Sequence, residues 1–290
     1  MSLRDSAPPG LKSVGRRAIR SLARPTAALR MMPNFIVAGG SRCGTTSLHR
    51  ALLTHPGIVP PMVNKGVHYF DIDYLRGENW YRSHFPLSAV AARRTAAVPN
   101  APMCFESSGY YMHHPLAPER IAQTLPEVRL VVMLRDPIER AYSAYKHEFA
   151  RGFETVDDFE RALELEPERL AGEVEKIRSD PGYVSHAHRH QSYVDRGQYV
   201  EQVRRLFDLF GPSRVHVMFS EDFFATPEPE YERLLSFLGL PIIQAPAYEQ
   251  HNARRRAPMD EATLSRLTAH FEPYDTALAE LLGRTPSWRR

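Results

Sequence analysis

Short apolar runs alternate with amphipathic runs along this chain, and the alternation predicts strands that alternate with helices. Strand-like runs rich in β-branched and aromatic residues span residues 35–38, 103–105, 128–134 and 214–219. Helical patterns, apolar on one side, span residues 46–53, 77–85, 114–125, 137–151, 198–210, 228–238 and 260–282. Because a strand followed by a helix recurs, we predict a single three-layer α/β domain. Its central parallel sheet should hold about four or five strands flanked by helices.

Two parts of the chain stand apart from this repeat. Helices at 156–165 and 168–177 are predicted on the periphery, and the last helix should break near Pro273, because proline removes a helical hydrogen bond. Residues 1–33 are rich in Arg, Ala, Pro and Ser and hold one acid, Asp5. We predict a basic, disordered leader over 1–33 and the folded domain over 34–290.

A glycine loop follows the first predicted strand. The apolar run stops at Gly39, and a helical pattern resumes at Thr46. A helix that starts there aims unpaired N–H groups and partial positive charge at the loop, which suits a phosphate. The spacing from Gly39 to Gly44 and Thr45 matches a nucleotide-binding P-loop except that Thr45 replaces the lysine. Since that lysine binds the β- and γ-phosphates, triphosphate chemistry is disfavoured. Arg42 supplies a cation elsewhere in the loop.

A second polar turn, Arg135-Asp136, follows the strand at 128–134. Asp136 is a good N-cap, and Pro137 is a good first residue for the helix that follows. Ser143 lies about two turns along that helix. It shares a pocket with Arg135 if the helix packs side-on to the ligand. In parallel α/β sheets such turns meet the glycine loop at the carboxyl ends of the strands, where ligands bind.

The glycine loop and the Arg135 segment together resemble those of the sulfotransferases that use 3′-phosphoadenosine 5′-phosphosulfate (PAPS). The resemblance covers residues 34–290 and is greatest to the carbohydrate-type branch, with heparan-sulfate sulfotransferases and bacterial relatives. The pattern at 271–288 is also similar to the bacterial relatives. In that family Arg135 and Ser143 correspond to residues that bind the 3′-phosphate. The residues that would cradle the 5′-phosphosulfate are Ser41, Arg42, Cys43, Gly44, Thr45, Thr46 and Ser47.

The resemblance implies PAPS as sulfuryl donor and no metal. The donor has no γ-phosphate, so the missing lysine is harmless. Arg42 replaces the family's loop lysine and would stabilise charge on the leaving oxygen. It would do so electrostatically, because arginine does not release its proton near neutral pH. Three consecutive arginines, Arg254, Arg255 and Arg256, are similar to a late basic loop that covers the donor phosphates. The alternative is a solvated charge run.

The residue expected to act as general base differs from that of the family. The heparan-sulfate branch has a glutamate two residues before its histidine, and this chain has Gly66 before His68. We therefore expect His68 to accept the acceptor's proton. Glu106, in a polar turn that ends the strand at 103–105 and faces the ligand crevice, is the second candidate, and Lys65 is expected to contact the sulfuryl group or a phosphate. Alternatively, His68 holds the loop through a hydrogen bond. Tyr193 is predicted to line the adenine or acceptor pocket, with core packing as the alternative.

Composition narrows the partners and the location. A net charge of +3 suits an anionic ligand but is smaller than expected of a nucleic-acid-binding protein. Two cysteines, Cys43 and Cys104, make no disulfide framework, which indicates a reducing, cytoplasmic location. No apolar run reaches the length of a membrane span. The leader offers two alternatives to disorder: an amphipathic helix over 11–31 with weak peripheral membrane contact, or an organelle-targeting peptide.

Three hypotheses of function result. The leading one is a sulfotransferase that moves the sulfuryl group, in line and without metal, to a hydroxyl of a sugar or glycolipid. A P-loop kinase or NTPase is the rival enzyme, although it requires the loop lysine. A phosphate-binding module without catalysis is the third, supported by Gly66. The alternating histidines at 186, 188 and 190 lack the clustered acids or cysteines of a metal site and are expected to be polar surface.

Overall fold

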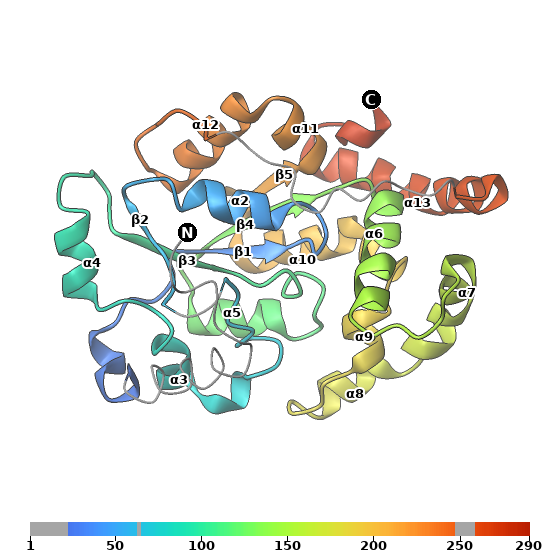
Figure 1. Cartoon of the computed structure of the whole chain (residues 1–290), viewed down its shortest axis with the longest axis horizontal. Coiled ribbons are helices and arrows are strands. Elements are labelled where there is room, and N and C mark those ends of the chain that lie inside the picture. The colour runs from blue at the N-terminus through green and yellow to red at the C-terminus, as the bar shows by residue number, and fades with distance from the viewer. Residues whose placement is uncertain (1–22, 63–64, 247–258) are drawn as a thin grey trace.

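A five-stranded parallel sheet forms the centre of the protein in the computed structural model, which describes residues 23–62, 65–246 and 259–290 (Figure 1). The strand order is β2-β3-β1-β4-β5, and every pairing is parallel. The strands are β1 Phe35–Gly39, β2 Ile58–Val59, β3 Met103–Ser107, β4 Arg129–Leu134 and β5 Val215–Phe219. The predicted α/β class and the size of the sheet are confirmed. Because β3 and β4 flank β1 on opposite sides, the carboxyl end of β1 lies where the strand order reverses.

Helices connect the strands in nearly the predicted order. They are α2 Thr45–Leu52, α3 Glu78–Arg82, α4 Ser88–Arg94, α5 Ala117–Thr124, α6 Pro137–Ala150, α7 Phe159–Leu170, α8 Glu173–Ser179, α9 His186–His190, α10 Tyr199–Phe210, α11 Ser220–Ala225, α12 Pro227–Leu238 and α13 Glu261–Leu282. The predicted break in the last helix is wrong, because α13 runs through Pro273. Phe271 and Leu278, on either side of the proline, are both fully buried, and this packing holds the helix together.

The two faces of the sheet are covered by different helices, which confirms the three layers. Side chains alternate along β1, so that Phe35 and Val37 pack with α2 and α12, whereas Ile36 and Ala38 pack with α5 and α10. Both faces are apolar, as expected of a parallel sheet with helices on each side.

Helix α6 leaves the sheet and forms a third cluster with α7 and α13. Its apolar residues Ile138, Ala141 and Tyr145 pack there. Ser143 lies on the opposite side of the helix by its spacing from them. Helices α7, α8 and α9 gather beside α6 at one end of the molecule (Figure 1). One face of α6 is therefore buried, and the other is turned toward the glycine loop.

Residues 23–33, assigned to the leader by composition, pack against the domain. The 3-10 helix η1 (Arg24–Leu29) lies against α3, and the buried Arg30 donates a hydrogen bond of 2.8 Å to the Phe85 carbonyl. Ordered structure therefore begins before the predicted boundary at residue 33. Residues 1–22 lie outside the described residues, and their disorder stays a prediction. Of the helices that the structure describes, none has both the length and the apolar character to span a bilayer.

Candidate active site

The glycine loop ends at the amino terminus of α2. Gly44 is the N-cap residue and has a φ of 90°, in the left-handed region that favours glycine. A Cβ at this position would also approach the Phe224 ring to 3.0 Å. The first N–H groups of α2, at Thr45 and Thr46, lack helical partners by geometry and face the loop. The predicted strand, loop and helix are thus observed, and they form a site suited to an oxyanion.

Lys65 reaches this helix terminus from a distant segment of the chain. Its ammonium group donates hydrogen bonds of 3.1 Å to the hydroxyl oxygens of both Thr45 and Thr46. Burial, together with the charge of Arg42, lowers the pKa of Lys65 to about 8. The group is still mostly protonated at neutral pH. A cation therefore occupies the neighbourhood from which the P-loop lysine is missing in sequence, a placement that no local motif indicates.

Arg42 points away from that terminus, toward α6. Its Nε donates to the Ser143 hydroxyl at 3.2 Å, and its Nη1 lies 3.5 Å from Nδ1 of His147. Arg42 itself has a φ of 70°, a strained conformation for a residue with a side chain. The bond between Arg42 and Ser143 joins the glycine loop to the segment that resembles a 3′-phosphate site. The cation at the threonine hydroxyls is thus Lys65, and the expected role of Arg42 at the leaving oxygen stays a prediction.

The second anion site lies along one face of α6. Asp136 caps the helix as predicted, accepting the N–H groups of Ile138 and Glu139. Arg135 forms an ion pair of 3.4 Å with Glu139, and Tyr199 donates a hydrogen bond of 2.8 Å to the Arg135 carbonyl. Glu139 and Ser143 are four residues apart on α6 and so share a face, and the ion pair holds Arg135 against the start of that face. The side-on packing of α6 that the sequence argument required is present.

The cysteine of the loop offers no thiolate. Cys43 is fully buried, and burial raises the pKa of its thiol to about 11. Its Sγ points to the Ser41 carbonyl at 3.7 Å. Ser47 is also buried, one turn into α2. The thiol of Cys43 therefore faces the core, and this residue can serve an anion only through the backbone.

His68 and Asp71 form a hydrogen-bonded pair within one turn. His68 Nδ1 lies 2.8 Å from Asp71 Oδ2, with the carboxylate side chain fully buried and the imidazole 39% exposed. Burial acts to lower the pKa of His68, but the hydrogen bond and charge of Asp71 outweigh it, and the pKa is raised. The pair leaves the other ring nitrogen, Nε2, for a substrate proton. Sequence reasoning missed Asp71, for which the three-residue spacing was the available signal.

Glu106 is not in a polar turn, as the sequence suggested, but inside β3, where it is completely buried. Its carboxylate accepts hydrogen bonds from Val67 N–H at 2.8 Å, Ser108 at 2.7 Å, Tyr81 at 2.7 Å and Tyr111 at 3.0 Å. Burial raises its pKa, opposed by these donors. With both oxygens occupied and no solvent contact, Glu106 holds the segment around His68 in place and is not positioned to act as the base.

Gly66 occupies the position at which the resembling branch has a glutamate. A Cβ added there would lie 2.6 Å from the Ser107 carbonyl oxygen and 2.9 Å from the Ser108 hydroxyl. The backbone of β3 leaves no room for a side chain at position 66. The packing therefore requires glycine where the resembling branch has glutamate.

Replacing Gly66 with alanine is expected to destabilise the protein by about 1–3 kcal/mol, the usual cost of overpacking. Gly66→Glu should be more destabilising and should not raise activity. Urea unfolding monitored by circular dichroism measures the loss. Gly182→Ala, at an exposed glycine whose nearest neighbours are side-chain atoms, is the matched control. Unchanged stability in Gly66→Ala would contradict the packing argument.

The remaining predicted site residues, Tyr193 and the basic stretch at 254–256, have different outcomes. Tyr193 is fully buried in the cluster of α6, α7 and α13, and its hydroxyl donates to Glu154 at 2.9 Å. It packs in the core, as the alternative had it, and does not line a binding pocket. The basic stretch Arg254, Arg255 and Arg256 lies outside the described residues, so its role over the donor stays a prediction.

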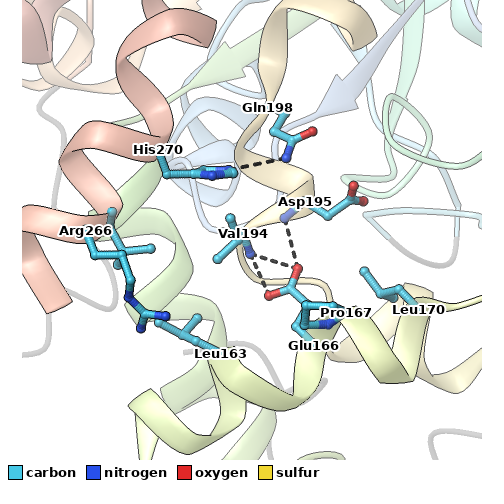
Figure 2. Close-up of a pocket in the computed structure, with 10 residues that line it drawn as sticks. Leu163, Glu166, Pro167, Leu170, Val194, Asp195, Gln198, Arg266 and His270 are labelled. Atoms are coloured by element: carbon cyan, nitrogen blue, oxygen red, sulfur yellow. Dashed lines mark hydrogen bonds between the residues drawn. The ribbon is translucent and has the colours of Figure 1, made fainter.

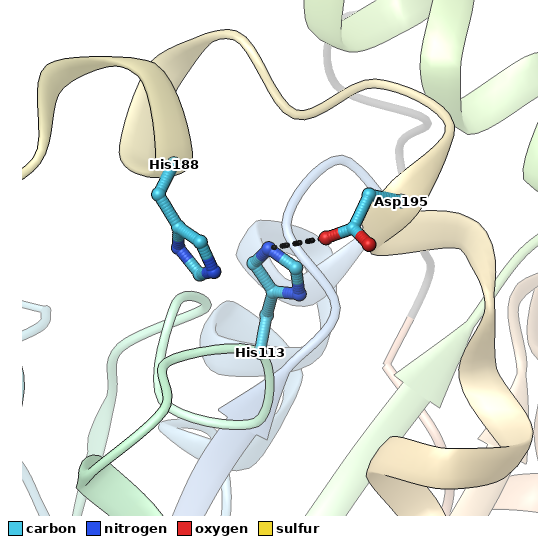
Figure 3. Close-up of side chains that lie close together, drawn as sticks. All are labelled: His113, His188 and Asp195. Atoms are coloured by element: carbon cyan, nitrogen blue, oxygen red, sulfur yellow. Dashed lines mark ion pairs between the residues drawn. The ribbon is translucent and has the colours of Figure 1, made fainter. Parts of the chain in front are cut away.

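The alternating histidines do not converge on one point. His186 and His190 bind the Phe153 carbonyl and Glu148, respectively. His188 instead meets His113 and Asp195, with potential ligand atoms within 4.8 Å of one another (Figure 3). The two imidazole rings stack at 4.3 Å, so their in-plane lone pairs do not converge, and burial and nearby cations, Arg196 among them, hold the pKa of His113 well below its usual range. This surplus of positive charge opposes a metal cation, and the cluster serves to hold α9.

A pocket of about 430 Å³ lies beyond α6, among α7, η3 (Asp195–Gly197) and α13 (Figure 2). The Glu166 carboxylate at its wall accepts the N–H groups of Val194 and Asp195, and burial raises its pKa to about 7. Leu163 and Leu267 of this pocket belong to the cluster that covers the apolar face of α6. The pocket is therefore on the opposite side of α6 from Ser143 and apart from the glycine loop.

The sheet, the glycine loop and the helix terminus together define a P-loop-like α/β protein. The chain belongs to the sulfotransferase domain family, whose sequence pattern matches residues 32–266. The crystal structure of a sulfotransferase from Alicyclobacillus acidocaldarius is 30% identical with a TM-score of 0.64, covering 90% of this chain and 100% of that one. These findings confirm the suspected family.

Curated relatives are more distant in sequence. The membrane-associated sulfotransferase kil1 of Dictyostelium discoideum is 24% identical, over 89% of this chain and 67% of that protein. The human bifunctional heparan sulfate N-deacetylase/N-sulfotransferase 3 is 26% identical over 89% of this chain, which spans only 31% of that protein. The predicted cytoplasmic location is contradicted by these comparisons, because kil1 is membrane-associated by name.

Proposed function

We propose that this sulfotransferase transfers the sulfuryl group of PAPS to a hydroxyl group of a carbohydrate or glycolipid, in line and without a metal ion. The observation that carries the proposal is the pair of hydrogen bonds from Lys65 to Thr45 and Thr46 at the start of α2. It supplies a cation and a helix terminus for the 5′-phosphosulfate. The Arg42–Ser143 bond connects this site to a second one for the 3′-phosphate.

Charge builds on the oxygen between phosphorus and sulfur as the S–O bond breaks. The Lys65 ammonium and the N–H groups of α2 are placed to stabilise that charge. With a pKa lowered to about 8, Lys65 is also acidic enough to share its proton with the leaving oxygen. Arg42 contributes positive charge from the α6 side, where it is bound to Ser143.

The acceptor hydroxyl loses its proton as it attacks sulfur. His68 is the base in this proposal, with Nδ1 held by Asp71 and Nε2 directed to the acceptor. Asp71 stabilises the imidazolium that results, as a buried orienting carboxylate does in other His-dependent sites. The heparan sulfate relatives support a carbohydrate acceptor.

A transfer assay with ³⁵S-labelled PAPS tests the proposal. The acceptor panel should contain neutral sugars, uronate-containing and amino-sugar oligosaccharides, and glycolipids, each with and without EDTA. We expect label in at least one carbohydrate or glycolipid acceptor, with a rate that EDTA leaves unchanged. Transfer of phosphate from ATP in place of sulfate would overturn the proposal, and binding of the donor product without any transfer would support a non-catalytic module.

Arg135→Ala should weaken binding of adenosine 3′,5′-bisphosphate, because it removes a charge-assisted phosphate contact worth about 1.5–3 kcal/mol. Isothermal calorimetry would then show a Kd roughly 10-fold to 100-fold higher. Glu139→Gln should tighten binding, since it frees Arg135 from its ion pair. Arg93→Ala on α4 is a control for loss of a basic side chain outside the site. Unchanged affinity in Arg135→Ala would remove this residue from the donor site.

A further inference from the structure

Arg189 presents a half-buried guanidinium group on α9, near the candidate base. Its positive charge reaches the His68 ring and acts to lower the pKa of that ring. Arg42 and Arg135 both bind other side chains. The guanidinium of Arg189, in contrast, makes no hydrogen bond or ion pair to any other residue within 23–62, 65–246 and 259–290. Among the residues that the structure describes, this guanidinium therefore has no anionic partner.

Helix α9 is held firmly despite its short length. The Tyr110 hydroxyl lies 2.7 Å from His188 Nδ1, and the His188 ring stacks on His113 (Figure 3). Arg196 donates hydrogen bonds of 2.8 Å to the carbonyls of both His188 and Arg189. The backbone of Arg189 is thus fixed by contacts that do not involve its own side chain.

The loop that holds α9 also holds the candidate base. Ser108, two residues before Tyr110, accepts a hydrogen bond of 3.2 Å from the His68 N–H. His68 and Arg189 are therefore attached to the same loop, residues 108–113, and their relative position is set. The two donor sites, in contrast, are built on α2 and α6.

We infer that Arg189 binds an oxyanion of the acceptor, a carboxylate or a sulfate next to the hydroxyl that is sulfated, so that the acceptor is an acidic sugar. The inference rests on the proposed function. A planar guanidinium fork matches such an oxyanion with two parallel hydrogen bonds. His68 sets where the reacting hydroxyl must lie, and Arg189 adds a recognition point beside it. Arg189 is thus a specificity-determining residue for the acceptor.

The test uses a matched pair of acceptors: a uronate-containing oligosaccharide, and the same oligosaccharide after reduction of its carboxylates to alcohols. For the wild type, we expect reduction to lower kcat/KM by about 10-fold to 100-fold, the effect of one charge-assisted contact. Arg189→Ala should have the same kcat/KM for both acceptors, close to the wild-type value for the reduced one. Arg189→Lys should recover part of the preference for the uronate-containing acceptor. The Kd for adenosine 3′,5′-bisphosphate should stay unchanged. A third oligosaccharide, sulfated but carboxyl-reduced, tells which oxyanion is bound.

Arg178→Ala, on the exposed side of α8, is the control for loss of a nearby arginine and should keep the wild-type preference. The inference is overturned if an active wild type prefers neutral sugars, if Arg189→Ala keeps the preference for an acidic one, or if the variant loses donor affinity instead. If no acceptor is sulfated at all, the proposed function fails rather than this inference alone.

A pH profile gives a second readout that a structural role would not change. The charges facing His68 are Asp71 and Glu106, which act to raise its pKa, and Arg189, which acts to lower it. Removing Arg189 should raise the pKa of His68, and because the base must be neutral, the acid limb of kcat/KM should move to higher pH. An unmoved limb in Arg189→Ala would contradict the placement beside His68.

Discussion

Replacing Lys65 with alanine is expected to lower kcat by about 100-fold to 1,000-fold, the usual loss when one preorganised group that stabilises transition-state charge is removed. The ammonium lies 3.1 Å from the hydroxyls of Thr45 and Thr46, at the terminus where the 5′-phosphosulfate is proposed to bind. Its contact with the leaving oxygen strengthens as the S–O bond breaks, so kcat should fall more than donor affinity. Steady-state kinetics with labelled PAPS, combined with calorimetry on adenosine 3′,5′-bisphosphate, separates the two effects.

The pH dependence distinguishes charge from proton donation at this residue. The pKa of Lys65 in the free protein is lowered to about 8, so the wild-type kcat/KM for the donor should decline as pH rises through that value and the ammonium loses its proton. Lys65→Arg keeps the charge at every accessible pH and should lose this alkaline limb while keeping part of the rate. Lys146→Ala, an exposed lysine on α6, is the matched control. A kcat within a few-fold of wild type in Lys65→Ala would remove this lysine from the reaction.

His68→Ala is expected to lower kcat by about 100-fold to 10,000-fold, the range for loss of a general base, with little change in donor affinity. The imidazole is partly exposed and oriented through Nδ1 by the buried Asp71 carboxylate. Turnover measured at saturating donor and acceptor tests this expectation. If turnover stays within a few-fold of wild type, His68 is not the general base. Glu106 would not be the replacement, because its carboxylate is completely buried.

Asp71→Asn tests the pair from the other side. The Asp71 charge and hydrogen bond raise the pKa of His68 against the opposing effect of burial. The amide should therefore let that pKa fall, and the acid limb of the kcat/KM profile should move to lower pH. The plateau rate should also fall, because a weaker base accepts the proton less readily. A shift of the limb to higher pH would contradict the orientation of the pair.

The parts of the structure that depend on local pattern were predictable. Strands β1, β3, β4 and β5, the turn from β1 into α2 and the Asp136 cap of α6 follow from periodicity and from side chains within a few residues, whereas the two-residue β2 was not predicted. Ser143 facing the loop was also foreseeable, because an amphipathic helix turns its polar side away from the core. The resemblance to the family was based on the glycine loop and the Arg135 segment, in this order along the chain.

The details that sequence reasoning could not supply depend on contacts between distant segments. Lys65 reaches the threonine hydroxyls across about 20 residues of chain, a distance at which no spacing rule applies. Glu106 was expected in a polar turn facing the ligand crevice, but β3 extends through it and its buried carboxylate accepts four hydrogen bonds. Tyr193 was left between an adenine or acceptor pocket and the core, because tyrosines occur in both, and the packing of the folded chain places it in the core. The cytoplasmic location was inferred from the presence of two cysteines without a disulfide framework, which does not determine the compartment of a protein.

The central claim is that two anion sites, one at α2 and one on α6, bind the two ends of one donor. Calorimetry that compares adenosine 3′,5′-bisphosphate, adenosine 5′-monophosphate and ATP with magnesium tests it most directly. The account predicts that the bisphosphate binds at least about 10-fold more tightly than the monophosphate, since it alone engages Arg135, and that this advantage disappears in Arg135→Ala. Tighter binding of ATP with magnesium, or equal affinity for the monophosphate and the bisphosphate, would contradict it.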